Sequence, residues 1–131
     1  VVWFSLDNPG QSPRVPVFCG VKDFPALFDI CGNHRYRDDA ALWHYREANK
    51  LAATKWGTYR KVMEKNIKHF EDKGQRELPF VEATYKQILA EKGEDAARDF
   101  LTGYTSDFFG ATIVRWDEMT RDYWIQSRFG L

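Results

Sequence analysis

The sequence predicts a mainly α-helical protein, in which a short N-terminal β ribbon is followed by three long antiparallel helices. Two observations support this fold class. Between residues 38 and 73 an apolar or aromatic side chain returns at every third or fourth position, which is the period of an α-helix with one buried side. Residues 1–18 instead contain two β-prone segments around a turn signal. The 131 residues are enough for one core.

The N-terminal part predicts the ribbon. Residues 1–6 (VVWFSL) are apolar and β-prone, and residues 7–10 (DNPG) combine the residue types that favour a turn. Residues 12–18 (SPRVPVF) return as a second extended segment, whose prolines are typical of an edge strand or an irregular ribbon. Residues 20–37 have no sustained period and predict a long connection.

The first helix is expected to span residues 38–73. Asp38 or Asp39 is suited to cap its start, and Gly74 is suited to end it. A helix of this length would extend about 54 Å, so it needs long partner helices to cover its apolar side. Those partners are expected in the remaining C-terminal residues.

The second helix is expected from Pro79, which suits a first helical turn, to Lys92, with Gly93 as its end. Glu94 and Asp95 open the third helix, whose predicted apolar side is formed by Ala97, Leu101, Tyr104, Phe108, Ala111 and Val114. This helix is expected to continue to Ser127. Gly103 and Gly110 inside it indicate either a break or a close approach of another helix.

Two regions follow from this order: residues 1–37, the ribbon and its long connecting loop, and residues 38–131, the helical array. The chain begins within a strand-like segment, without an initiator Met or a signal-peptide pattern. We therefore expect Val1 to be a cleavage boundary rather than a natural start, and the two regions to belong together in one larger domain. The cellular compartment is left open.

Composition and motifs exclude several function classes. The 19 basic and 19 acidic residues give a net charge of 0, which disfavours a nucleic-acid partner. There is no apolar run long enough to span a membrane. No nucleotide-binding, serine-hydrolase or metal-ligand motif is present, so we expect neither a cofactor nor a metal. The three histidines, His34, His44 and His69, are scattered, and we interpret them as surface or packing residues.

Cys19 and Cys31 lie in the loop-rich N-terminal part and leave three alternatives. They are two unpaired, partly buried thiols, or a disulfide of an oxidising compartment, or one of them is a catalytic thiol. The polar residues of the ribbon, Asp7, Asn8 and Arg14, are the candidate site residues, because polar clusters at strand ends often carry function. The alternative is a structural turn in which Asp7 and Asn8 bond their own backbone.

Four segments carry a resemblance to a known family. They are WFSLDNPGQSPRVPVFCG (3–20), HRYRDDAALWHYREANKLAATKWG (34–57), ELPFVEATYKQI (77–88) and DFFGATIVRWDEM (107–119). In this order they resemble the C-terminal part of the dipeptidase A and secernin family, which are cysteine peptidases of the N-terminal-nucleophile hydrolase class. The first two blocks are the more specific, and the similarity extends over nearly the whole chain.

The resemblance implies an αββα sandwich in the intact protein and hydrolysis of dipeptides by an N-terminal cysteine whose own α-amine acts as the base. This chain departs from the family because it begins with Val1, and its internal cysteines have no free α-amine. It is therefore expected to contain no catalytic residue and to be inactive alone. By position, Arg14 is the best match to an arginine near the nucleophile, with Asn8 and Asp7 as weaker active-site support. The implied partners are a dipeptide substrate, the rest of the parent chain and further copies of it.

The alternative function is a non-enzymatic helical module whose long helix docks partner proteins. Such a module would fold as a complete unit and would not self-associate. A C-terminal fragment would instead expose apolar surface that its missing neighbours cover. The sequence alone leaves both hypotheses open.

Overall fold

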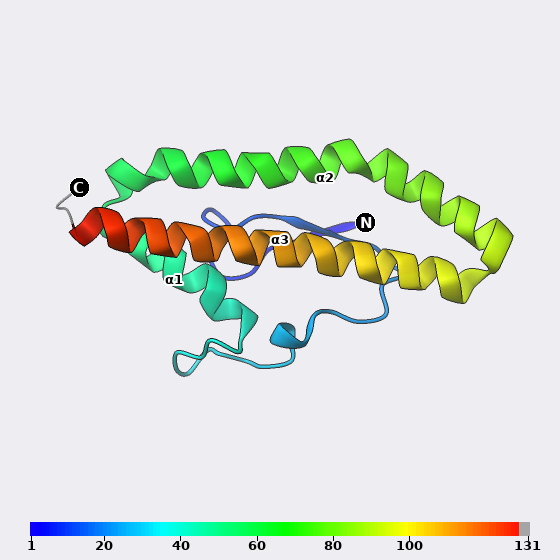
Figure 1. The fold of residues 1–131 in the computed structure, drawn as a ribbon, viewed down its shortest axis with the longest axis horizontal. Coiled ribbons are helices and arrows are strands. Elements are labelled where there is room, and N and C mark those ends of the chain that lie inside the picture. The colour runs from blue at the N-terminus through cyan, green and yellow to red at the C-terminus, as the bar shows by residue number, and fades with distance from the viewer. Residues whose placement is uncertain (129–131) are drawn as a thin grey trace.

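A computed structural model describes residues 1–128. It contains two strands, a short 3₁₀ helix and three packed helices, in the order β1 (Val2–Phe4), β2 (Val15–Val17), η1 (Ala26–Phe28), α1 (Ala41–Thr54), α2 (Trp56–Lys92) and α3 (Glu94–Arg128). Figure 1 shows α2 and α3 as two long antiparallel helices, with α1 crossing at the end where α3 finishes. The predicted fold class, a short antiparallel ribbon followed by long packed helices, is confirmed at this level.

The ribbon forms where it was predicted. Strands β1 and β2 are antiparallel, and Phe4 pairs with Val15 while Trp3 pairs with Pro16. The turn after β1 is built by Asp7, which has a left-handed backbone (φ 69°), and by Asn8, whose Oδ1 accepts a hydrogen bond from the Gly10 N–H at 2.9 Å. Strand β2 contacts both α2 and α3, so the ribbon is attached to the helical pair.

The predicted single helix over residues 38–73 is wrong at both ends and in the middle. The first helix starts at Ala41, and its N-cap position is occupied by Ala40, which makes no side-chain cap. Asp39 does not cap the helix either, because its carboxylate pairs with Arg37 at 2.7 Å. The chain leaves the helical conformation at Lys55 (φ −139°, ψ 58°), and α2 begins at the next residue.

The predicted stop at Gly74 and start at Pro79 are also wrong, because α2 runs through both residues. Gly74 is buried, and a Cβ placed there would lie 2.7 Å from Cζ3 of Trp3. The glycine thus lets the β1 tryptophan reach the helix backbone. Gly93 (φ 92°) ends α2 as predicted, and Glu94 and Asp95 open α3.

Helix α3 continues through Gly103 and Gly110 without a break. A Cβ on either glycine would meet nothing within 4 Å, so no other helix of residues 1–128 approaches there. Neither role predicted for the two glycines is therefore realised within the described chain.

The core lies between the three helices and the ribbon, and α3 supplies three of its four largest fully buried side chains. The cluster is Val15, Tyr45, Ala48, Ala52, Tyr59, Met63, Phe70, Phe108, Phe109, Ile113, Trp116, Met119 and Tyr123. Ala111 and Val114, expected on this side, are exposed. No helix within the described residues is both long and apolar enough to cross a lipid bilayer.

We expect Gly74→Ala to destabilise the protein. The new methyl group would displace the Trp3 ring, which costs about 1–3 kcal/mol and exceeds the gain of up to ~1 kcal/mol in helix propensity. Urea unfolding followed by circular dichroism measures the difference. Gly57→Ala is the matched control, since nothing lies within 4 Å of a Cβ there. Equal stability of the two variants would contradict the close contact between Trp3 and α2.

Candidate functional site

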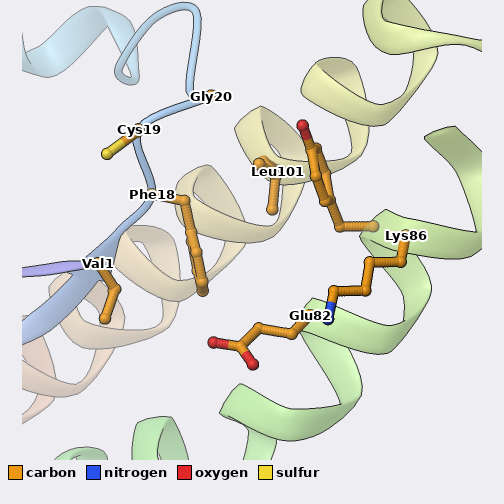
Figure 2. A pocket seen from close by; sticks show the side chains of 8 residues that line it. Val1, Phe18, Cys19, Gly20, Glu82, Lys86 and Leu101 are labelled. Atoms are coloured by element: carbon orange, nitrogen blue, oxygen red, sulfur yellow. The ribbon is translucent and has the colours of Figure 1, made fainter.

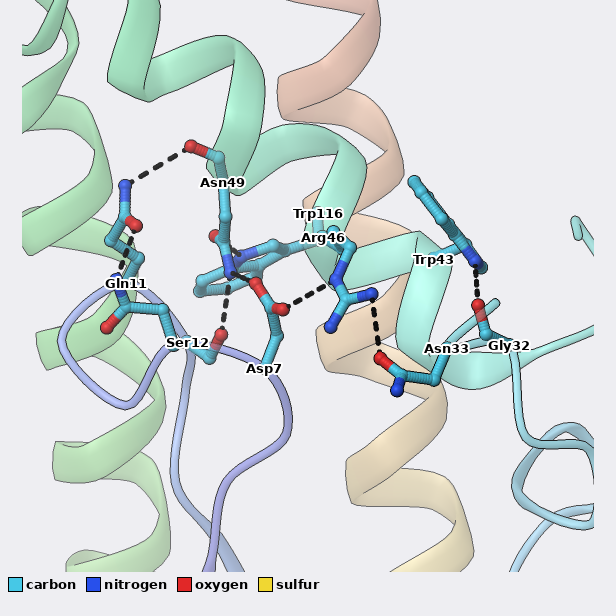
Figure 3. Close-up of polar contacts among 10 residues, drawn as sticks. Asp7, Gln11, Ser12, Gly32, Asn33, Trp43, Arg46, Asn49 and Trp116 are labelled. Atoms are coloured by element: carbon cyan, nitrogen blue, oxygen red, sulfur yellow. Dashed lines mark hydrogen bonds and ion pairs between the residues drawn. The ribbon is translucent and has the colours of Figure 1, made fainter. Parts of the chain in front are cut away.

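The buried side chain of Asn49 on α1 makes hydrogen bonds to two other parts of the fold. Its Nδ2 donates to Ser12 Oγ at 2.8 Å and to Asp7 Oδ2 at 3.0 Å. Its Oδ1 accepts from Trp116 Nε1 at 3.2 Å. Figure 3 shows this side chain between the ribbon turn and the tryptophan of α3. One amide therefore joins the ribbon, α1 and α3.

Asp7 is held by charge-assisted hydrogen bonds. Its Oδ1 accepts from Arg46 Nε at 2.8 Å, and the two side chains are only 14% and 21% exposed. Burial by itself would raise the pKa of Asp7, but the hydrogen bonds from Asn49 and Arg46 outweigh it and hold the pKa below its ordinary value. Both carboxylate oxygens are engaged, so the geometry suits Asp7 to fix the turn rather than to accept a proton from a substrate.

Arg46 extends the network to the long loop. Its Nη1 donates to Asn33 Oδ1 at 3.4 Å, and its guanidinium lies 5.4 Å from the centroid of the Trp43 ring. Trp43 in turn donates from Nε1 to the Gly32 carbonyl at 2.5 Å. These contacts attach the loop before α1 to the part of α1 that also binds Asp7 of the ribbon turn.

The three candidate site residues do not converge on one point. Asp7 contacts α1, whereas Asn8 bonds within its own turn, to Gly10 and through its Nδ2 to Gln11 Oε1 at 2.8 Å. Arg14 points to α2, where its Nη1 lies 2.5 Å from Glu71 Oε1. Its side chain is 49% exposed and lines an open hollow of about 420 Å³ with Trp3, Glu71, Asp72 and Gln75.

Cys19 and Cys31 are both unpaired and exposed, so the disulfide alternative is wrong and so is the partial burial. Cys19 borders a hollow of about 240 Å³ between the ribbon and the α2–α3 pair. Figure 2 shows its sulfur pointing away from Glu82 and Lys86 on α2. Among the described residues neither thiol has a hydrogen-bonded base, which is the arrangement that a nucleophile needs.

One histidine has a defined environment that the sequence does not indicate. His44 lies between Asp117 on α3 (Nδ1–Oδ1 2.8 Å) and the Asp38 carbonyl (Nε2–O 2.7 Å), and so ties the start of α1 to α3. Within residues 1–128 there is no group of histidine, cysteine and carboxylate side chains arranged to hold a metal ion.

Sequence reasoning missed Arg46, Asn49, Ser12 and Trp116. A signal for two of them was present. Asn49 directly follows Ala48 of the apolar stripe, and Arg46 lies three residues earlier on the adjoining side. A polar amide beside the buried stripe needs partners, which is an indication of a buried network. Its partners on the ribbon and on α3 could not be found from the sequence alone.

A comparison with protein families, with curated proteins and with solved structures found no match for this chain.

We expect Asp7→Asn to lower the free energy of unfolding by about 1–3 kcal/mol at neutral pH, because Arg46 loses its buried anionic partner. Asparagine tolerates the left-handed backbone at this position, so the turn is kept, while the side chain loses its charge and one of its two acceptor oxygens. Thermal and urea unfolding measure the effect. Asp29→Asn, an exposed carboxylate without a side-chain hydrogen bond in the described chain, is the control.

The same pair of proteins gives a pH prediction. Because the pKa of Asp7 is lower in the folded chain than its ordinary 3.8, ionised Asp7 stabilises the fold above that pH. This contribution is lost as the pH falls through the folded pKa. The stability difference between wild type and Asp7→Asn should therefore be constant near neutrality and shrink below pH ~4. A difference that is independent of pH would show that the carboxylate charge is not what Arg46 and Asn49 require.

Proposed function

We propose that this chain is the C-terminal part of a cysteine-type dipeptidase of the N-terminal-nucleophile class, and that it supports a catalytic cysteine located elsewhere in the parent protein. In that reaction the cysteine thiol attacks the dipeptide carbonyl, and the α-amine of the same cysteine accepts the proton of the thiol. The residues of this chain would hold the site in place rather than perform the chemistry. The chain alone is expected to be inactive.

The supporting observation is the convergence at Asn49 of the segments that carry the family resemblance. Asp7 and Ser12 come from the block 3–20, Arg46 and Asn49 from 34–57, and Trp116 from 107–119. These blocks lie far apart in the sequence and share no local pattern. A single buried network gives a physical reason for the three blocks to occur together in one chain.

In the parent protein the ribbon would be the part nearest the reaction. Its turn is anchored to α1 by Asp7, and strand β2 begins directly after Arg14. The Nε and Nη2 groups of Arg14 have no hydrogen-bonding partner among the described residues. These free donors could bind a substrate carboxylate or a developing oxyanion. The helices would form the outer helical layer of an αββα sandwich.

Exposed apolar side chains on α2 are compatible with the alternative function, a helical module that docks partner proteins. Phe80 on α2 is 72% exposed, and Leu89 follows it toward the helix end. These residues suit a docking surface, but they are equally the surface that a missing part of a sandwich would cover. Hydrolysis of dipeptides separates the two proposals.

The dipeptidase proposal is tested with the protein expressed from its complete reading frame, assayed on a panel of dipeptides beside residues 1–131 alone. We expect release of free amino acids by the complete protein only. Replacing the processed N-terminal cysteine by alanine should abolish this release. Without the thiol, no thioester with the substrate can form and the amine of the dipeptide is not expelled. If the complete protein is inert on the whole panel and has no processable cysteine, the proposal is wrong and the interaction module is preferred.

The role of Arg14 is tested in the same complete protein. Arg14→Ala should reduce kcat/KM by ~100-fold, the usual effect of removing one donor to a reacting oxygen. Its ion pair with Glu71 is exposed and contributes little to stability, so the thermal midpoint should change little. Arg60→Ala removes a comparable exposed pair, with Glu64, and serves as the control. Equal activity of the two variants would assign Arg14 a structural role only.

A further inference from the structure

One side of α3 is not used by the fold. Its central residue, Val114, is 57% exposed, and Ile125 further along is 57% exposed. The same stripe, with gaps of three or four residues, consists of Gly103, Asp107, Gly110, Val114, Glu118, Arg121 and Ile125. In Figure 1 α3 lies at the front of the molecule, with no other element in front of it.

Two of the three charged residues of this stripe, Asp107 and Arg121, have no partner within the described chain, whereas Glu118 pairs with Arg115 of the same helix at 3.1 Å. Asp107 and Arg121 are both exposed, and neither forms an ion pair or a side-chain hydrogen bond there. They are placed symmetrically, because Asp107 lies seven residues before Val114 and Arg121 seven residues after it. Each charge is therefore about 10 Å from Val114 along the helix axis, on opposite sides.

The remaining residues of the stripe are also placed symmetrically about Val114, and their side chains differ in size between the two halves. Gly103 precedes Val114 by eleven residues, and Ile125 follows it by eleven. Gly110 and Glu118 are likewise four residues to either side. A small residue on one half of the stripe thus corresponds to a large one on the other half. Such a stripe is complementary to itself when it is turned end to end.

We propose that this side of α3 is a dimer interface, in which α3 of a second copy of the chain packs antiparallel across a two-fold axis at Val114. In an isologous pair, residue i contacts j′ and residue j contacts i′. Asp107 then faces Arg121 of the partner subunit twice, and Ile125 lies over Gly103 of the partner subunit twice. Opposite charges thus meet at both Asp107–Arg121 positions, and the glycines permit close approach of the two backbones.

This arrangement also gives the two α3 glycines a role. Each costs about 1 kcal/mol of helix propensity relative to alanine, and a Cβ at either position would meet nothing in its own chain. The proposal does not rest on the dipeptidase hypothesis, since dimerisation is measured by mass and not by activity.

The test is sedimentation equilibrium of the 131-residue chain over a range of concentrations. The wild type should be a reversible dimer. Asp107→Arg places two arginines opposite one another at each paired position, and Arg121→Asp places two aspartates there, so each variant should weaken dimerisation by about tenfold or more. Lys61→Asp on α2, a comparable charge reversal at an exposed residue without a partner in the described chain, should have no effect.

Mixing the two single variants identifies the register. In a mixed dimer every arginine again faces an aspartate, so an equimolar mixture of Asp107→Arg and Arg121→Asp should regain the wild-type affinity. Gly110→Leu, which favours the helix and clashes only across the interface, should abolish the dimer while circular dichroism shows intact helices. A wild type that remains monomeric, single variants that dimerise normally, or a mixture that does not recover would each overturn the proposal.

Discussion

The structure depends on one buried amide. Asn49 is almost fully inaccessible to water, and an unsatisfied amide in such a place would cost several kcal/mol. Its Nδ2 reaches two residues of the ribbon, Asp7 and Ser12, and its Oδ1 reaches the indole of α3. Because these partners belong to the ribbon and to α3, satisfying Asn49 fixes where these two parts lie relative to α1. The apolar core then packs within that frame.

Helix α3 has apolar residues on two opposite sides. Its core side contributes Trp116, Phe108 and Phe109, which are among the largest fully buried side chains of the described residues. The opposite side carries Val114 and Ile125, so apolar residues occur around much of the helix. A helix with this distribution is typical of a position between two packed layers. The described chain supplies only one of those layers, which is the physical reason to expect a partner on the other.

The fold class could be predicted from periodicity, but the helix boundaries could not. The apolar stripe continues in phase from Ala52 to Tyr59 across the interruption at Lys55, so both helices bury the same side and the pattern shows no break. Gly74 and Pro79 are local signals for a helix end, yet α2 passes through both. At Gly74 the contact with Trp3 prevails over local propensity, and that contact joins residues far apart in the sequence.

The exposed side of α3 shows why a short apolar period can mislead. The residues predicted for its core side, from Ala97 to Val114, are separated by slightly less than 3.6 residues on average, so the predicted stripe drifts around the helix. It begins on the buried side at Ala97 and Leu101 and ends on the exposed side at Val114. This drift indicates that the predicted stripe combines residues of two separate apolar surfaces.

The candidate site was found only in part for a related reason. Asp7 has a local turn signal, whereas its partners Arg46 and Asn49 are recognised only once α1 is placed against the ribbon.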